Sequence, residues 1–440
     1  MSRINRSLTL AAVSLAALIA AQGGAQAGAF GLREQSTTGQ GMSFAGVASG
    51  SGGVSSMFWN PATMTFAPGF QSEWHAAAII PESKIAPIYT IPAGLAALGP
   101  SGDIGLDAVV PSSYTSYQLN DRLWLGLYTG APFGLTTKPN PVWAGQLYAR
   151  TTSVTSFEVE PTIAYKVNDW LSIGAGVRAQ YFKVRYFSAT GPSPQSPSPF
   201  SPSAGLEGDS YGFGYSLGAT LTPFAGTTIG IGFRSAMEHD LEGEFQYFGV
   251  PPIKAHLVLP ESVSVGVSQR ITDAFTLHAT AEWTNWSRLG FPRVYNGFTG
   301  GLLAQAPYLP LAYDDGWFFS VGGEYRINPA WTVRAGVGYE ISPIDVETRN
   351  PRLPDSDRVW LSLGTTYNWS DQLSFDLAYT HIFSVGNTDI NIAPGNPTFA
   401  TRGVVFAANV DSQVDIISAA VKYRWDNPAK AIPAPIVRKY

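Results

Sequence analysis

The residues best suited to chemistry in this sequence are its histidines and the acidic groups beside them. The chain contains five histidines: His75, His239, His256, His278 and His381. Their spacing fits no metal site, and no serine or carboxylate accompanies them in a nucleophile pattern. Only Glu238-His239-Asp240 is dense, and we interpret it as a solvated polar cap at the edge of a strand. We therefore predict no catalysis, no metal and no cofactor.

The chain begins with the pattern of an export signal. Arg3 and Arg6 precede an apolar run at 8–21, and Ala25-Gln26-Ala27 fits a cleavage site. We therefore assign residues 1–27 to a signal peptide and begin the mature protein at Gly28. The chain has no Cys, so no disulfide framework is available in the export compartment. No later stretch is apolar for the roughly 18 residues that a transmembrane helix needs.

The composition is unusual for a soluble domain. Charged residues make up 13% of the chain, about half of the usual ~25%. Hydrophobic residues make up 45% and aromatic residues 13%. This balance is typical of a barrel that turns apolar side chains to lipid and places aromatic girdles at both interfaces. The net charge of −5 argues against a nucleic-acid partner.

Alternation of apolar and polar residues is the main structural signal. Within 171–181 the odd-numbered residues are apolar, whereas the even-numbered ones are Ser172, Gly174, Gly176, Arg178 and Gln180. A period of two indicates a strand with one lipid-facing side and one polar side toward a lumen. Similar alternation occurs at 263–267, 331–339, 361–367 and 375–379.

Short turns alternate with long polar or Pro/Gly-rich segments. The short turns lie at Asn120-Asp121, Asn168-Asp169, Pro223 to Gly226, Thr272-Asp273, Asn328-Pro329 and Ser370-Asp371. The long loops are expected at about 81–103, 132–145, 188–208, 239–256, 289–312, 343–355 and 385–409. Six short turns and seven long loops predict an all-β, 14-stranded antiparallel transmembrane β-barrel over residues 70–425. A soluble β-sandwich or propeller is the competing interpretation, but neither requires this asymmetry.

Two segments do not fit the barrel. Residues 28–69 are rich in Gly, Ser, Thr and Ala but carry Met57, Phe58, Trp59 and Phe66. A flexible tail would rarely contain so many large apolar groups, so we interpret this segment as an N-terminal hatch, or plug, inside the lumen. Residues 426–440 are interpreted as a short periplasmic extension.

Large apolar side chains also gather in two of the predicted loops. They are Phe200, Leu206, Phe245, Tyr247, Phe248, Val250 and Ile253. An exposed apolar patch often marks a binding groove or a membrane contact. We therefore take Phe245, Phe248 and Ile253 as candidate groove residues. Lipopolysaccharide contact and packing between loops remain the alternatives.

Several motifs in order along the chain resemble one known family. The mature start GAFGLREQSTTGQGMSFAG and the later SSMFWNPATMT are similar to the hatch of FadL-type long-chain fatty acid transporters. Further similar segments are Ala131 to Leu135, Leu259 to Ser262, Ala281 to Ser287 and Leu353 to Ser362. Each motif alone is weak, but together they span nearly the whole mature chain.

The resemblance implies a function. It predicts a monomeric 14-stranded barrel in the Gram-negative outer membrane, inserted by the barrel assembly machinery, with a hatch of about 40 residues. A hydrophobic ligand would enter a groove between long loops and pass to a pocket beside the start of the hatch. Hatch rearrangement would then release it, in some members laterally through a kinked strand. Transport in this family is passive.

The hatch supplies the gating candidates. Phe30 is expected to plug the inner pocket. Asn60, Pro61 and Ala62 occupy the position of the family's NPA motif. Asn60 can bond hatch backbone and Pro61 fixes its turn, although a plain turn without further role is the alternative.

Basic residues are the candidates for holding a carboxylate. By resemblance, Lys183 and Arg185 lie where a cation holds the ligand head group. However, the alternation that turns Arg178 inward turns Lys183 outward unless a bulge intervenes. Otherwise Lys183 and Arg185 are rim charges that bind lipid phosphates. Arg178, Arg234 and Arg334 are further lumen candidates, although a lumen arginine more often pairs with a barrel or hatch carboxylate.

One departure from the family leaves the ligand open. Some members have a second basic residue where this chain has Asp314 and Asp315, and two carboxylates near a pocket would repel an anionic head group. Uptake of long-chain fatty acids or similar hydrophobic molecules is the main interpretation. Uptake of hydrocarbons or aromatic compounds is its alternative. A general porin and a structural or adhesive barrel are alternatives of another class.

Overall fold

A computed structural model describes residues 29–190, 202–246, 252–304, 306 and 308–426. The predicted signal peptide 1–27, Phe248, and residues 427–440 of the predicted extension lie outside the described residues. None of the helices in the described part is long and apolar enough to cross a membrane.

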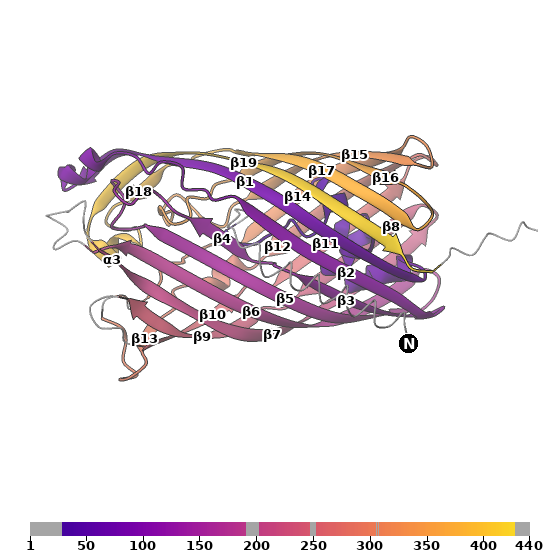
Figure 1. Ribbon diagram of the computed structural model, residues 1–440, viewed down its shortest axis with the longest axis horizontal. Coiled ribbons are helices and arrows are strands. Elements are labelled where there is room, and N and C mark those ends of the chain that lie inside the picture. The colour runs from indigo at the N-terminus through magenta and orange to yellow at the C-terminus, as the bar shows by residue number, and fades with distance from the viewer. Residues whose placement is uncertain (1–28, 191–201, 247–251, 305, 307, 427–440) are drawn as a thin grey trace, which may run out of the picture.

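The molecule is a closed antiparallel barrel of 14 strands, as predicted (Figure 1). Nine strands are continuous: β1 Phe70–Ile91, β2 Ala108–Asn120, β5 Thr151–Lys166, β6 Leu171–Ala189, β7 Ser203–Phe224, β14 Gly316–Arg326, β15 Trp331–Ile341, β16 Arg358–Asn368 and β19 Val405–Arg424. The other five are each made of two pieces: β3 Leu123–Gly130 with β4 Gly134–Thr137, β8 Thr227–Arg234 with β9 Met237–Gln246, β10 Pro252–Leu259 with β11 Ser262–Arg270, β12 Phe275–Thr284 with β13 Val294–Asn296, and β17 Leu373–Ser384 with β18 Ile390–Ile392. Pairing of β1 with β19 closes the ring.

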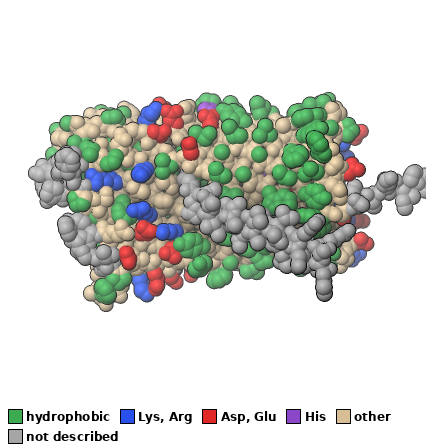
Figure 2. Space-filling view, viewed as in Figure 1, with side chains coloured by type: hydrophobic (Ala, Val, Ile, Leu, Met, Phe, Trp, Pro, Cys, Tyr) green, Lys and Arg blue, Asp and Glu red, His purple; other side chains and the backbone are tan. Residues whose placement is uncertain are grey.

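The two faces of each strand differ as the alternation requires. In β6, Ile173 and Val177 are exposed, whereas Arg178 and Gln180 are buried. Apolar side chains cover the middle of the visible face, and charged side chains gather toward its ends (Figure 2). Such a surface suits a hydrocarbon layer bounded by polar interfaces.

Residues 29–69 lie inside the barrel and contain only short helices: α2 Thr37–Gln40, η1 Val47–Ser49, η2 Gly53–Phe58 and η3 Pro61–Phe66. α2 contacts β16, β17 and β19 on one side, while η3 contacts β5, β6 and β7 on the other. Figure 1 shows this segment within the ring of strands, near the end at which β19 finishes. We call residues 29–69 the hatch from here on.

Several predicted long loops are shorter than expected. The range 239–256 is largely β9 and β10, and 81–103 contains the last part of β1 and the helix η4 Ala93–Leu98. The sequence prediction was wrong there because polar residues continue the alternation beyond the membrane, where water faces the outer side of the strand. The remaining helices, η5 Trp286–Leu289 and α3 Phe399–Arg402, lie in loops.

Two interruptions of the wall position the site. Pairing of β2 with β3 stops at Ser112 and Gly130, and residues 131–133 separate β3 from β4. Farther around the barrel, the chain leaves the sheet after β12 and forms η5, which carries the buried side chain of Trp286. Both interruptions adjoin the first residues of the hatch.

Candidate functional site

Phe30 sits in an aromatic cage at the start of the hatch. Its ring centroid lies 4.8 Å from that of Trp286, 6.0 Å from Phe133 and 6.5 Å from Phe182. The side chain is only 2% exposed. Edge-to-face contacts of this kind stabilise a ring beyond the area it buries. The hatch thus fills a space that is otherwise walled by apolar groups.

The backbone beside Phe30 completes the interrupted wall. Leu32 N donates to Pro132 O at 2.8 Å, and Gly134 N donates to Phe30 O at 2.9 Å. On its other side the kink is held by one hydroxyl: Ser156 Oγ accepts from Phe133 N at 2.9 Å and donates to Phe133 O at 2.7 Å. The hatch therefore acts as a short strand at the kink between β3 and β4.

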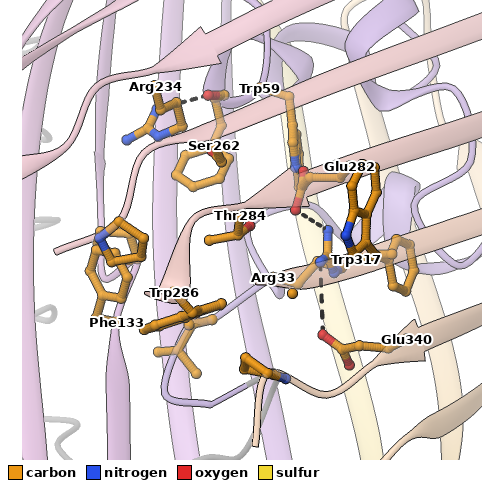
Figure 3. Close-up of a pocket in the computed structure, with 18 of the residues that line it drawn as sticks. Arg33, Trp59, Phe133, Arg234, Ser262, Glu282, Thr284, Trp286, Trp317 and Glu340 are labelled. Carbon is orange, nitrogen blue, oxygen red and sulfur yellow. Dashed lines mark hydrogen bonds and ion pairs between the residues drawn. The ribbon is translucent and has the colours of Figure 1, made fainter. Parts of the chain in front are cut away.

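Arg33 fixes the next part of the hatch by charge. Its Nη1 lies 2.6 Å from Glu282 Oε1, its Nη2 lies 3.9 Å from Glu340 Oε1, and its guanidinium stacks on Phe318 at 3.8 Å. Figure 3 shows Arg33 between the two carboxylates, with Phe133 and Trp286 across a small cavity of about 100 Å³. This inner pocket is thus apolar on one side and ion-paired on the other.

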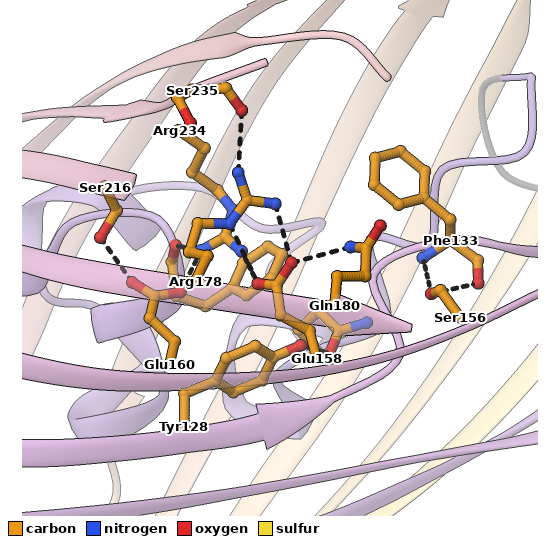
Figure 4. Close-up of polar contacts among 12 residues, drawn as sticks. Tyr128, Phe133, Ser156, Glu158, Glu160, Arg178, Gln180, Ser216, Arg234 and Ser235 are labelled. Atoms are coloured by element: carbon orange, nitrogen blue, oxygen red, sulfur yellow. Dashed lines mark hydrogen bonds and ion pairs between the residues drawn. The ribbon is translucent and has the colours of Figure 1, made fainter. Parts of the chain in front are cut away.

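Arg178 and Arg234 also line the inner pocket, and barrel carboxylates neutralise both. Arg178 pairs with Glu158 at 2.8 Å, and Arg234 bridges Glu158 and Glu160 (Figure 4). Arg234 also donates to Phe58 O at 2.7 Å and stacks on the Phe58 ring. The expectation that lumen arginines pair with carboxylates is confirmed, and Arg334 likewise pairs with Glu324.

Glu34 is the unusual charge of the hatch. It is 2% exposed, and no side chain in the described part of the chain donates a hydrogen bond to its carboxylate. Burial raises the pKa of Glu34 to about 7, and Glu340 adds to the rise, whereas the residue's own backbone N–H, Arg33 and Arg358 oppose it. Its carboxyl therefore titrates near neutral pH.

Asn60, Pro61 and Ala62 join the hatch to the wall. Asn60 is fully buried and caps η3 by accepting from Ala62 N at 3.0 Å, and Pro61 begins the helix. Asn60 Nδ2 donates to Ala219 O of β7 at 2.9 Å. A Cβ at Gly218 would collide with Asn60 Oδ1, so glycine there lets the hatch lie against the sheet.

A second, larger cavity of about 500 Å³ lies among the outer loops. Phe245 lines it, and Ile253 belongs to the same apolar cluster. Both side chains are buried. The expected exposed groove was wrong on this point, because Phe245 and Ile253 belong to the inner faces of β9 and β10.

Lys183 and Arg185 are not brought to either cavity. β6 pairs with β7 in unbroken register, so the bulge that would turn Lys183 inward is absent there. Both side chains are about half exposed and contact Glu207, at 2.6 Å for Lys183 and 3.6 Å for Arg185. Asp314 and Asp315 line neither cavity, and Asp315 accepts from Trp283 at 2.8 Å.

The arrangement has features that the sequence alone did not reveal. Trp286 in the cage and two loop arginines in the outer cavity, Arg352 and Arg402, were not predicted. The Trp283-Thr-Asn-Trp286 segment was noted only as a family motif, and the loop arginines follow no periodic pattern. Within the described ranges no group of three His, Asp or Glu could hold a metal ion.

The comparisons with known proteins identify the family. The family described as outer membrane protein transport protein (OMPP1/FadL/TodX) matches residues 16–425. The chain belongs to this family and is an outer-membrane transport protein, not an enzyme.

Individual relatives are similar to this chain over most of its length. The long-chain fatty acid transport protein of Escherichia coli K12 is 26% identical over 435 residues, which cover 88% of this chain and 94% of that protein. A crystal structure of a Pseudomonas aeruginosa FadL homologue has a TM-score of 0.78 at 23% identity, covering 90% of this chain and all of that one. The Ralstonia pickettii toluene transporter TbuX has a TM-score of 0.64 at 18% identity, over 90% of this chain and 100% of its own.

Proposed function

We propose that this protein takes up long-chain fatty acids or similar hydrophobic molecules by passive passage through the outer membrane. One observation carries the proposal. A single buried apolar cluster includes Tyr186, Leu206 and Phe245, which line the outer cavity, and also Phe30 and Trp286 of the inner cage. A general porin has a polar, water-filled lumen, whereas here apolar side chains join the loops to the hatch. Capture at the loops and release at the hatch follow from this path.

The release step is proposed to occur at the kink. Residues 30–32 of the hatch supply the backbone bonds that the wall lacks beside Pro132. If Phe30 leaves its cage, those bonds break, and the wall beside β2 and β4 loses its filling. A hydrophobic molecule would then reach the lipid directly, without crossing the polar periplasmic end.

Hydrocarbons and aromatic compounds remain the second candidate ligands. The cations of the inner pocket, Arg33, Arg178 and Arg234, all pair with carboxylates. No spare charge there requires an anionic ligand. The E. coli relative is named for long-chain fatty acids and TbuX for toluene, so the family accommodates both chemistries.

Exposed basic residues indicate where the barrel contacts the membrane lipids. Lys183, Arg185 and Lys254 lie on the outer face toward the loop end of the barrel. We propose that they meet phosphates of outer-membrane lipid and lipopolysaccharide. Insertion by the barrel assembly machinery and a monomeric state complete the proposal.

Uptake by cells tests the function. Cells that lack their own fatty acid transporter would express the intact protein or a variant lacking residues 28–57, and would be given labelled oleate or labelled hexadecane. We expect oleate uptake with the intact protein and altered uptake with the variant. No uptake of either compound, despite correct surface folding, would overturn the proposal. Hexadecane uptake without oleate uptake would favour the hydrocarbon alternative.

A further inference from the structure

Two arginines of the outer cavity lack the carboxylate partner that each arginine of the inner pocket has. Arg352 belongs to the loop between β15 and β16, Arg402 ends α3, and both line the cavity. Neither lies within 4 Å of a carboxylate of the described residues, and the undescribed residues contain no Asp or Glu. Five arginines that face the lumen are ion-paired: Arg33, Arg178, Arg234, Arg334 and Arg358. Arg349 is also buried, but its guanidinium donates to the backbone carbonyls of Asp355, Asn387 and Asp389 instead.

The two guanidinium groups converge on one point of the wall. Arg352 Nη1 donates to Phe187 O at 3.2 Å, and Arg402 Nη2 donates to Ser188 Oγ at 2.6 Å. Phe187 and Ser188 are consecutive residues of β6, so the two positive charges are held side by side. Within the described ranges, Arg352 is bonded through Nη1, and Arg402 through Nε and Nη2. Nε and Nη2 of Arg352 and Nη1 of Arg402 have no hydrogen-bond partner among the described residues. These N–H groups can bind a ligand.

The electrostatics of the pair favour an anion. Burial, together with the nearby charge of Arg402, lowers the pKa of Arg352 to about 10, and Tyr186 opposes the shift. Burial also lowers the pKa of Arg402. Both groups stay charged at neutral pH, yet each is partly desolvated with no carboxylate among the described residues to neutralise it. An anion between them would offset that cost, since charge-assisted hydrogen bonds are the strong ones.

The rest of the cavity suits an apolar chain with a polar end. Its apolar lining includes Leu147, Tyr148, Tyr186, Leu206, Phe245 and Leu309. Thr398 also lines the cavity, and its buried hydroxyl has no hydrogen-bond partner among the described residues. The volume of about 500 Å³ lies within the roughly 300–1,000 Å³ typical of small-molecule sites.

We propose that Arg352 and Arg402 clamp the carboxylate of a long-chain fatty acid in the outer cavity, with the Thr398 hydroxyl as a third donor. The chain of the ligand lies along Leu206 and Phe245. The clamp rests on the proposed function and sharpens it, because it selects an anionic amphiphile over a hydrocarbon at the first step of uptake. When the fatty acid moves toward the inner pocket, it leaves the two arginines and contacts the apolar side chains between the two cavities.

Binding measurements on charge-removal variants test the clamp. Purified protein in amphipol would be titrated with oleate and, separately, with oleyl alcohol, which has the same chain but no charge. Arg352→Met and Arg402→Met keep much of the apolar stem and remove the charge. We expect each to weaken oleate binding by about tenfold or more, while oleyl alcohol affinity changes less than about twofold. Lys254→Met, a cation outside the cavity lining, should leave both affinities unchanged.

Lysine variants distinguish the loss of a positive charge from misfolding of the protein. Arg352→Lys and Arg402→Lys retain the charge, so they should recover part of the oleate affinity if the clamp is electrostatic. Equal loss of oleate and oleyl alcohol binding, without recovery by lysine, would overturn the clamp. Unchanged oleate affinity in the methionine variants would overturn it as well while leaving the proposed function standing. Intact protein that binds neither ligand and supports no uptake would instead overturn the proposed function, and the clamp with it.

Discussion

Asn60 holds the hatch to the barrel through a side chain that uses all its hydrogen-bonding groups. Its amide donates to Ala48 O at 2.7 Å within the hatch and to Ala219 O in the wall, and its oxygen caps η3. A plain turn residue would need only the last of these bonds. The structure therefore favours an anchoring role.

Removal of this amide should loosen the hatch. Asn60→Ala removes the donor to the buried Ala48 O, at a cost of ~1–3 kcal/mol, and also the bond from the hatch to Ala219 O in the wall. We expect faster proteolysis of the hatch in the folded barrel and a lower unfolding temperature. Thr65→Val, which removes a hatch hydroxyl bonded to Ala62 O and Ser172, provides a milder comparison. Identical proteolysis of Asn60→Ala and the unmodified protein would contradict the anchoring role.

Glu34 makes hatch docking sensitive to pH. Its pKa in the folded protein is about 7, above the ordinary value of 4.5. Below both values Glu34 is neutral whether the hatch is docked or released. As pH rises through this window, the docked state must carry a buried charge whose desolvation Arg33 and Arg358 only partly offset. Docking is therefore most favourable at acidic pH and weakens toward pH 8, because the released state binds fewer protons.

Substitution with glutamine should abolish this dependence. Glu34→Gln keeps the shape but cannot ionise, so the hatch should be more stable than the unmodified one at pH 8, by roughly 3 kcal/mol at most. At pH 4 the two proteins should agree. Hydrogen exchange of residues 29–40, corrected for intrinsic rates, measures docking at each pH. A hatch whose protection is equally pH-independent in both proteins would contradict this role for Glu34.

At the scale of elements, the kink between β3 and β4 depends on one hydroxyl. Ser156 holds both the N–H and the carbonyl of Phe133, where ladder bonds from β5 are missing. Ser156→Ala should therefore raise the hydrogen-exchange rate of residues 131–134 by about tenfold. Ser153→Ala removes only a bond to the Thr136 side chain and should leave that rate unchanged. Equal exchange in the two variants would show that the kink does not depend on Ser156.

Strand alternation explains which parts of the site were predictable. The period of two in β6 placed Arg178 inward and Lys183 outward, and the structure agrees. The family resemblance, however, suggested Lys183 as a head-group ligand, and a resemblance cannot report the direction of a side chain. Strand ends were misjudged near 239–256 because polar residues on an extramembrane strand look like loop residues.

The parts of the site that the sequence did not predict depend on the geometry of loops. Arg352 and Arg402 are 50 positions apart in the sequence and meet only because two loops fold over the end of β6. No periodic pattern encodes such a meeting. Trp286 escaped prediction for the same reason, since η5 leaves the sheet and turns its side chain into the lumen.

At the scale of the whole molecule, the barrel wall faces lipid on its outer side and the hatch on its inner side. Every backbone group that faces hydrocarbon must be bonded within the protein, so a barrel cannot keep an open gap in its wall. Here the bonds beside Pro132 are supplied by residues 30–32 of the hatch. We propose that breaking this same contact releases the hydrophobic molecule.

A disulfide lock across this contact tests that claim most directly. Gly31 and Phe133 are bridge partners, and the chain has no native Cys, so Gly31→Cys with Phe133→Cys should form one cross-link. Ser113→Cys with Thr129→Cys, across the intact pairing of β2 and β3, provides the matched control. We predict that oleate uptake by cells falls at least about tenfold in the locked protein and recovers on reduction, while the control pair transports normally in both states. Oleate uptake that is equal in the locked and reduced protein would contradict release at the kink.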